Sequence, residues 1–205
     1  MKKLGFLMLA IALMLGGSAF AQNVGDNSVY FTTYYTNNPY PASTTVPDAT
    51  VRVINDGDTG GTLWADFYVF DDSQELTECC ACGITPDGLL SESVQRQLTS
   101  TPLTGIHRGR GVIKLISSSS PNPFTPTPVA GLRAWATHIQ AQYTTNVPYN
   151  GGNPVGKAPF YVTETQMADS NLAAGELNLL GQLCYFAEAL LSGNECPCTP
   201  EDYDF

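Results

Sequence analysis

Charged residues are scarce in this sequence of 205 residues, and basic residues are the scarcest. Asp, Glu, Lys and Arg make up 14% of the chain, whereas globular proteins usually contain about a quarter. Nine Lys and Arg stand against 19 Asp and Glu, which gives a formal net charge of −10. A chain this acidic repels nucleic-acid phosphates and anionic membranes. The composition therefore excludes a basic nucleic-acid binder, a coiled coil and an ordinary, highly charged cytosolic enzyme.

Catalytic motifs are also lacking. The chain has only two histidines, His107 and His138, and both are most simply structural or solvated. No G-x-S-x-G elbow accompanies them, and no H-E-x-x-H, P-loop or G-x-G-x-x-G occurs. We therefore expect no catalytic residue and no cofactor, and we do not expect an enzyme.

Two pairs of neighbouring carboxylates are the remaining candidates for a catalytic or metal-binding site. Asp71 and Asp72, or Asp56 and Asp58, resemble the paired acids of a secreted glycosidase. Both pairs lie in turns, where Asp is favoured because it bonds to the local backbone. A calcium loop at Asp56-x-Asp58 would need further ligands where Gly60 and Phe67 stand. We expect no metal site, with an irregular calcium site as the open alternative.

Long apolar runs are absent except at the start of the chain. Met1-Lys2-Lys3 is basic, residues 4–15 are apolar, and Ala19-Phe20-Ala21 offers the small residues that signal peptidase needs. We expect residues 1–21 to be a signal peptide and the protein to be secreted, to the extracellular space, the cell surface or the periplasm. Removing Lys2 and Lys3 leaves seven basic residues and a net charge of −12. No later run is long enough to span a bilayer.

The chain contains six cysteines, and they form two tight groups that both follow the expected signal sequence. The groups are Cys79, Cys80 and Cys82, and Cys184, Cys196 and Cys198. An even number in an exported chain predicts disulfides, and pairing one group with the other would close loops of roughly 100 residues, each worth about 4 kcal/mol. The individual pairs stay open. The alternative, zinc held by Cys80-x-Cys82 and Cys196-x-Cys198, is disfavoured because zinc ligand pairs are more widely spaced and occur in reducing compartments.

β-branched and aromatic residues predict a series of short strands separated by turns. The clearest is Leu63–Phe70, where small or apolar side chains alternate with Trp64, Asp66 and Tyr68. The other predicted strands are 28–36, 49–55, 74–79, 111–117, 132–140 and 160–165. A four-residue spacing from Leu90 to Leu98 suggests one short helix.

The chain changes character near Leu172, where apolar residues recur at helical spacing and predict a substantially buried helix over about 172–192. Its apolar positions are Leu177, Leu179, Leu180, Leu183, Cys184, Phe186, Ala187, Leu190 and Leu191. The whole pattern predicts a mainly β fold, an antiparallel, Ig-like β-sandwich with one C-terminal helix, stapled by disulfides. We expect an extended N-terminal segment at 22–48 and the sandwich with its helix at 49–205.

Several motifs resemble an uncharacterised group of exported bacterial proteins that contain cysteine. The motifs are TVRVIN at 50–55, YVFD at 68–71, the cysteine cluster ECCAC at 78–82 with ITPDGL at 84–89, and LRAWAT at 132–137. The resemblance covers the chain from Thr50 onward, and its most specific part is the cysteine cluster. It implies export and disulfides, and it carries no activity.

We predict from these features a secreted structural or surface protein, such as a filament or surface-layer subunit. Its N-terminal segment is rich in β-branched and aromatic residues and could complete the sheet of a neighbour by β-strand addition. The residues expected in this assembly strand are Val29, Tyr30, Phe31, Tyr34 and Tyr35. The expected partner is another copy of the chain or another cell-surface protein.

Two other functions stay open. A secreted module that binds glycans or other ligands would use exposed aromatic side chains, which are too many for one core. These aromatic residues are Tyr30, Tyr34, Tyr35, Tyr40, Trp64, Tyr68 and Tyr149. A secreted hydrolase is the third hypothesis, and no constellation of residues supports it.

Overall fold

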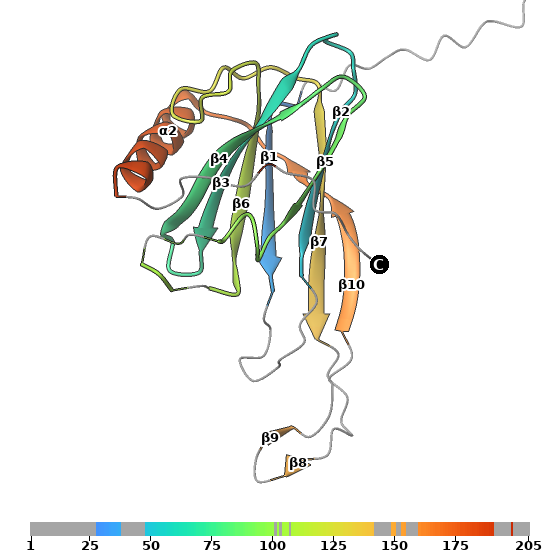
Figure 1. The fold of residues 1–205 in the computed structure, drawn as a ribbon, viewed down its shortest axis with the longest axis vertical. Coiled ribbons are helices and arrows are strands. Elements are labelled where there is room, and N and C mark those ends of the chain that lie inside the picture. The colour runs from blue at the N-terminus through green and yellow to red at the C-terminus, as the bar shows by residue number, and fades with distance from the viewer. Residues whose placement is uncertain are drawn as a thin grey trace, which may run out of the picture.

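The structure, a computed structural model, describes residues 28–37, 48–100, 102, 104–106, 108–141, 149–150, 153–154, 160–190 and 198. Within these residues two antiparallel sheets face each other, and helix α2 (Ala174–Ala189) packs on the outside of one of them (Figure 1). This arrangement confirms the predicted mainly β sandwich with a C-terminal helix. A two-stranded ribbon, β8 (Tyr149–Asn150) and β9 (Asn153–Pro154), forms a third, separate sheet.

The first sheet has five strands and contains the N-terminal strand. Its order is β11 (Ala168–Asp169), β1 (Tyr30–Thr36), β6 (Arg110–Ser118), β3 (Leu63–Asp71) and β4 (Leu76–Ile84). Strand β1 pairs with β6 along its whole length and with β11 at Phe31 and Thr32. The strand expected at 28–36 is therefore an interior strand of the protein's own sheet.

The second sheet has four strands. Its order is β10 (Phe160–Gln166), β7 (Leu132–Ala141), β2 (Thr50–Asn55) and β5 (Leu89–Ser93). The helix suggested over Leu90–Leu98 is wrong, because β5 begins this segment and turns follow it. Leu90 lies opposite Val53 of β2 in the ladder. Residues four positions apart lie on the same face of a strand as well as of a helix, so the spacing alone does not distinguish the two. Pairing with β2 is what makes the start of this segment a strand.

The main core lies between the two sheets. Strand β3 shows how the alternation of side chains fills it, because Leu63, Ala65, Phe67 and Val69 all belong to this core. The other large buried members are Phe31, Tyr35, Val51, Val53, Leu98, Ile113, Leu115, Leu132 and Ile139. The even-numbered residues of β3 face outward, as the sequence pattern predicts, and Tyr68 and Phe70 join a second cluster.

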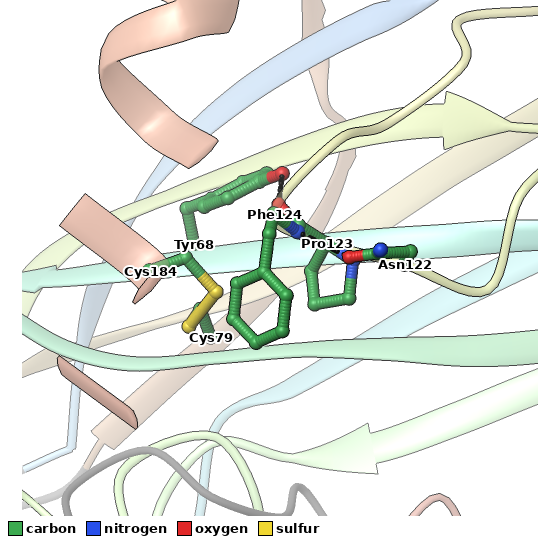
Figure 2. Close-up of a disulfide and its surroundings, with 6 residues drawn as sticks. All are labelled: Tyr68, Cys79, Asn122, Pro123, Phe124 and Cys184. Carbon is green, nitrogen blue, oxygen red and sulfur yellow. Dashed lines mark hydrogen bonds between the residues drawn. A yellow bond between two sulfur atoms is a disulfide. The ribbon is translucent and has the colours of Figure 1, made fainter. Parts of the chain in front are cut away.

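The second cluster lies between the first sheet and α2. The sheet contributes Tyr30, Tyr68, Leu76, Cys79 and Ile116, and the helix contributes Leu180, Cys184 and Ala187. The loop that follows β6 adds Phe124, and the Tyr68 hydroxyl donates a hydrogen bond of 2.6 Å to the carbonyl oxygen of Pro123 (Figure 2). The fold therefore has three layers: helix, first sheet and second sheet.

Two disulfides join the first cysteine group to the second. Cys79 is bonded to Cys184 of α2, with Cα atoms 5.7 Å apart, and Cys82 is bonded to Cys198, at 5.4 Å. Cys80 is disulfide-bonded as well, and Cys196 lies outside the described residues. The bonds close separations of 105 and 116 residues in the sequence. Because Cys82 and Cys198 are bonded to each other, they are not ligands of the alternative zinc site.

The period of two along β4 explains which cysteine goes where. Cys79 lies opposite Tyr68 and faces the helix, whereas Cys80 lies opposite Phe67 and Cys82 opposite Ala65, both of which face the main core. Disulfides of this kind indicate an oxidising, extracellular type of environment. Among the described residues, no helix has the length and hydropathy needed to cross a membrane.

Candidate functional site

The expected assembly strand contributes mostly to the two cores. Phe31 and Tyr35 are buried between the sheets, and Tyr30 lies in the cluster under α2, with Val29 packed against it. The Tyr30 hydroxyl donates a hydrogen bond of 3.1 Å to Glu176 Oε1. Burial, together with the negative charge of Glu176, raises the pKa of Tyr30. These four side chains hold β1 within its own domain.

Tyr34 is the member of the set that reaches solvent. It is 50% exposed, and its ring stacks on His138 of β7 with centroids 4.2 Å apart. His138 Nε2 lies 2.9 Å from Thr165 Oγ1 of β10. Burial lowers the pKa of His138, so the imidazole is neutral at pH 7. This short series of contacts links β1, β7 and β10 where the two sheets approach each other. The other histidine, His107, lies outside the described residues.

Strand β10 forms an exposed edge of the second sheet. Among the described strands it pairs only with β7. Every side chain from Tyr161 to Gln166 is exposed, so the strand projects beyond the core on both faces. Tyr161 and Val162 are each 54% exposed. An edge strand of this length, with no proline between Phe160 and Gln166 and with apolar side chains in water, is a template for pairing with another strand.

The backbone geometry shows which groups of β10 are available. The Met167 N–H donates to the Ala134 carbonyl of β7 at 2.8 Å. Because backbone groups alternate along an antiparallel strand, the N–H and C=O groups of Val162, Glu164 and Gln166 point away from β7. The one charged side chain on β10, Glu164, lies 2.6 Å from Arg52 Nη1 on β2. The sequence predicted this strand but not its position at the edge of the sheet, because local sequence patterns do not determine the order of strands in a sheet.

A buried carboxyl group lies on the outer face of β3. Asp66 is fully buried, and neither of its oxygens has a well-formed hydrogen bond among the described residues. Burial raises its pKa to about 8, and the nearby Ser118 hydroxyl offsets this effect only in part. Asp66 is therefore mostly protonated at pH 7. In this neutral form the carboxyl group can donate a proton but cannot act as a general base.

The carboxylates Asp71 and Asp72 are held by local contacts. Asp71 Oδ1 accepts hydrogen bonds from the backbone N–H groups of Ser73 and Glu75, at 2.8 and 3.1 Å. Asp72 Oδ2 accepts a bond of 2.8 Å from Arg110 Nε, and this bond lowers the pKa of Asp72. These side chains stabilise the turn after β3.

Asp56 and Asp58 also make contacts within their own turn and with a nearby arginine. Asp56 Oδ1 accepts a hydrogen bond of 3.1 Å from the Asp58 N–H, and its Oδ2 lies 3.7 Å from Arg133 Nε. Across the part of the chain that the structure describes, no three His, Cys, Asp or Glu residues are grouped to hold a metal ion.

The aromatic side chains that suggested a ligand-binding face divide between core and surface. Tyr30, Tyr35 and Tyr68 are buried. Trp64 is half-buried and lies close over Gly83, and Tyr34 is half-exposed. Tyr40 and the side chain of Tyr149 lie outside the described residues. The described part of the set does not form one exposed aromatic platform, because most of it is packed inside.

The fold and the cysteines define a class: a disulfide-linked protein of two antiparallel sheets with one helix packed on the outside. No family model matches the chain, and no curated protein matches it. A solved structure titled "Anabaena sensory rhodopsin transducer" aligns with 55% of this chain and 96% of its own, at 10% identity and a TM-score of 0.36. A TM-score this low does not establish a shared fold.

Proposed function

We propose that this protein is a secreted structural protein of the cell surface, and that its copies associate through the exposed edge of β10. The observation that carries the proposal is the edge itself, with both faces of the strand in solvent and an outward row of backbone donors and acceptors. The expected signal sequence and the disulfides support a location outside the cytosol.

The pairing strand in this proposal is β10 and not the N-terminal strand. Both sides of β1 have neighbours in the first sheet, β6 along the whole strand and β11 at Phe31 and Thr32. Releasing β1 would also remove Phe31 and Tyr35 from the main core. Strand β10 can pair without any such cost, because its exposed edge requires no rearrangement.

The chemistry of β10 suits pairing with an identical strand. Glu164 is the one charged side chain, and Arg52 of the same chain neutralises it. Two copies of β10 can therefore meet in antiparallel register without facing two uncompensated carboxylates. Tyr161 and Val162 would then lie on a continuous sheet and lose exposed apolar area.

The test uses the chain without residues 1–21, with its disulfides formed. Hydrogen exchange over 160–166 is measured at low and high protein concentration. We expect exchange at the outward amides of Val162 and Glu164 to slow by at least about tenfold as the protein associates, because these amides become hydrogen-bonded. Electron microscopy of the concentrated sample should then show assemblies and not only monomers.

A proline substitution provides the matched variant. Val162→Pro removes one outward N–H without touching the bonds to β7, and edge strands tolerate proline. Val162→Thr keeps both the N–H and the β-branched shape. We expect the proline variant to lose the concentration-dependent protection and the threonine variant to keep it. Protection that never depends on concentration, or that survives Val162→Pro, would overturn the proposal.

A further inference from the structure

Helix α2 buries one apolar face against the first sheet and leaves a second apolar face in solvent. The buried face carries Leu180, Gly181, Cys184 and Ala187. On another face Leu179 is 48%, Phe186 61% and Leu190 64% exposed. Full burial of such side chains contributes about 1.5–3 kcal/mol each. Exposed apolar clusters of this kind mark an interaction surface.

The spacing of the apolar residues on this face, three of them exposed and Leu183 half-buried against the second cluster, indicates that the partner is another helix. Leu179, Leu183, Phe186 and Leu190 follow one another at intervals of four, three and four residues. This is the heptad spacing at which the side chains of two helices interdigitate. We call these four residues the α2 seam. Tyr185 lies outside it and packs against Phe124 of the same chain, with ring centroids 6.2 Å apart.

The α2 seam is flanked by uncharged residues in a strongly acidic protein. The exposed residues next to the seam on the helix surface are Gly175, Gln182 and Ala189. Glu176 is turned toward the sheet, where it pairs with Lys114 and accepts the Tyr30 hydroxyl. The contact with Lys114 lowers the pKa of Glu176, so this carboxylate stays ionised and bound to Lys114. Since the chain carries a net charge of −10, this face lets two copies approach without burying carboxylates.

Two segments that adjoin described parts of the chain, 22–27 and 191–197, contain few apolar side chains that could cover the seam. Residues 22–27, which precede Ser28, contain one apolar side chain, Val24. Seven residues separate Leu190 from Cys198, and Cys198 is bonded to Cys82 of β4. An anionic lipid surface would repel a chain of this charge. A second copy, by contrast, supplies a helix with the same heptad seam and the same uncharged flanks.

We infer that the α2 seam binds the α2 seam of a second copy of this chain, about a two-fold axis. One helix face is a small interface, so the dimer should be of moderate affinity and depend on protein concentration. In Figure 1, α2 and β10 lie on opposite sides of the molecule. If β10 also pairs, which rests on the proposed function, two different two-fold contacts on opposite sides alternate and build an open chain of subunits.

The test measures mass by sedimentation in the Val162→Pro variant, in which β10 pairing is blocked. We expect a monomer–dimer equilibrium. Adding Phe186→Glu should raise the dissociation constant by at least tenfold, because it places two charges in the seam. Asn178→Glu adds the same charge to an exposed position of the same helix outside the seam and should leave the dimer intact. Circular dichroism checks that each variant is folded.

The outcomes separate the two proposals. A Val162→Pro chain that stays monomeric at all concentrations overturns the α2 contact, whatever β10 does. A dimer that persists with Phe186→Glu overturns it as well, and so does a monomer that binds phosphatidylcholine vesicles through Phe186. Loss of long assemblies in Phe186→Glu alone, with protection of the β10 amides retained, supports both contacts.

Discussion

Gly181 of α2 lies directly against the carbonyl oxygen of Phe124, where a Cβ atom would come within 2.2 Å of that oxygen. The loop after β6 therefore touches the helix backbone at a residue without a side chain. In Figure 2 the Phe124 ring lies next to the Cys79–Cys184 disulfide, so the loop, the helix and the sheet meet at one place. The helix layer depends on this close approach.

Substituting Gly181 by Ala should destabilise the protein. Alanine improves helix propensity by up to about 1 kcal/mol, but its Cβ would collide with a backbone oxygen that cannot move independently. We expect a net loss of about 1–3 kcal/mol in the free energy of unfolding. Gly175→Ala is the matched control, because nothing lies within 4 Å of its Cβ. Urea unfolding measures both, and a Gly181→Ala protein as stable as the control would contradict the packing.

Replacing Cys79 and Cys184 together by Ala should release the helix. The bond closes 105 residues of sequence, for which chain entropy gives about 4–5 kcal/mol. We expect α2 to become the first site of limited proteolysis, while the core between the sheets stays protected because Cys82–Cys198 remains. Hydrogen exchange of 174–189 provides the measurement. Unchanged protection of the helix would show that packing alone holds it.

Substituting Tyr68 by Phe should cost about 1–3 kcal/mol of stability. The hydroxyl donates a bond of 2.6 Å to the Pro123 carbonyl, and the ring is fully buried. Its loss leaves that carbonyl without its donor beneath the helix layer. Tyr161→Phe is the control, since that ring is 54% exposed and should change stability little. Equal effects of the two substitutions in thermal unfolding would refute this role of Tyr68.

The stability should fall as the pH rises from about 4 toward 8, through Asp66. Its pKa is near 3.8 when unfolded and about 8 when folded, so the folded state binds more protons in this window. The slope from this group approaches about 1.4 kcal/mol per pH unit. Asp66→Asn keeps the neutral shape and should flatten the profile relative to the native chain.

The comparison between the native and Asp66→Asn chains isolates this carboxyl group. Asp72 and Glu176 have lowered pKa values, so the stability that they contribute is lost as the pH falls, and both chains share that loss. Urea unfolding of the two chains across the pH window gives the difference directly. Parallel pH profiles would mean that Asp66 is ionised in the folded state.

The sequence alone determined the local elements. Alternation in Leu63–Phe70 predicted which side chains enter the main core, because a strand places neighbouring residues on opposite faces. The apolar spacing after Leu172 predicted the helix, which begins at Ala174 and ends at Ala189. The two cysteine groups predicted long-range bonds between them, and two such bonds are present. The strand and helix patterns, and the clustering of the cysteines within each group, all depend on residues close together in the chain.

The tertiary structure alone decided which strand lies inside a sheet and which lies at its edge. The sequence of β1 and that of β10 are both typical of strands, yet β1 is enclosed by two neighbours and β10 by one. The choice of Cys184 for Cys79 likewise required the helix to lie on the outer face of β4. Strand order and layer packing depend on contacts between residues far apart in the sequence. Local periodicity predicts which residues share a face of an element, but it does not indicate which distant residues that face contacts.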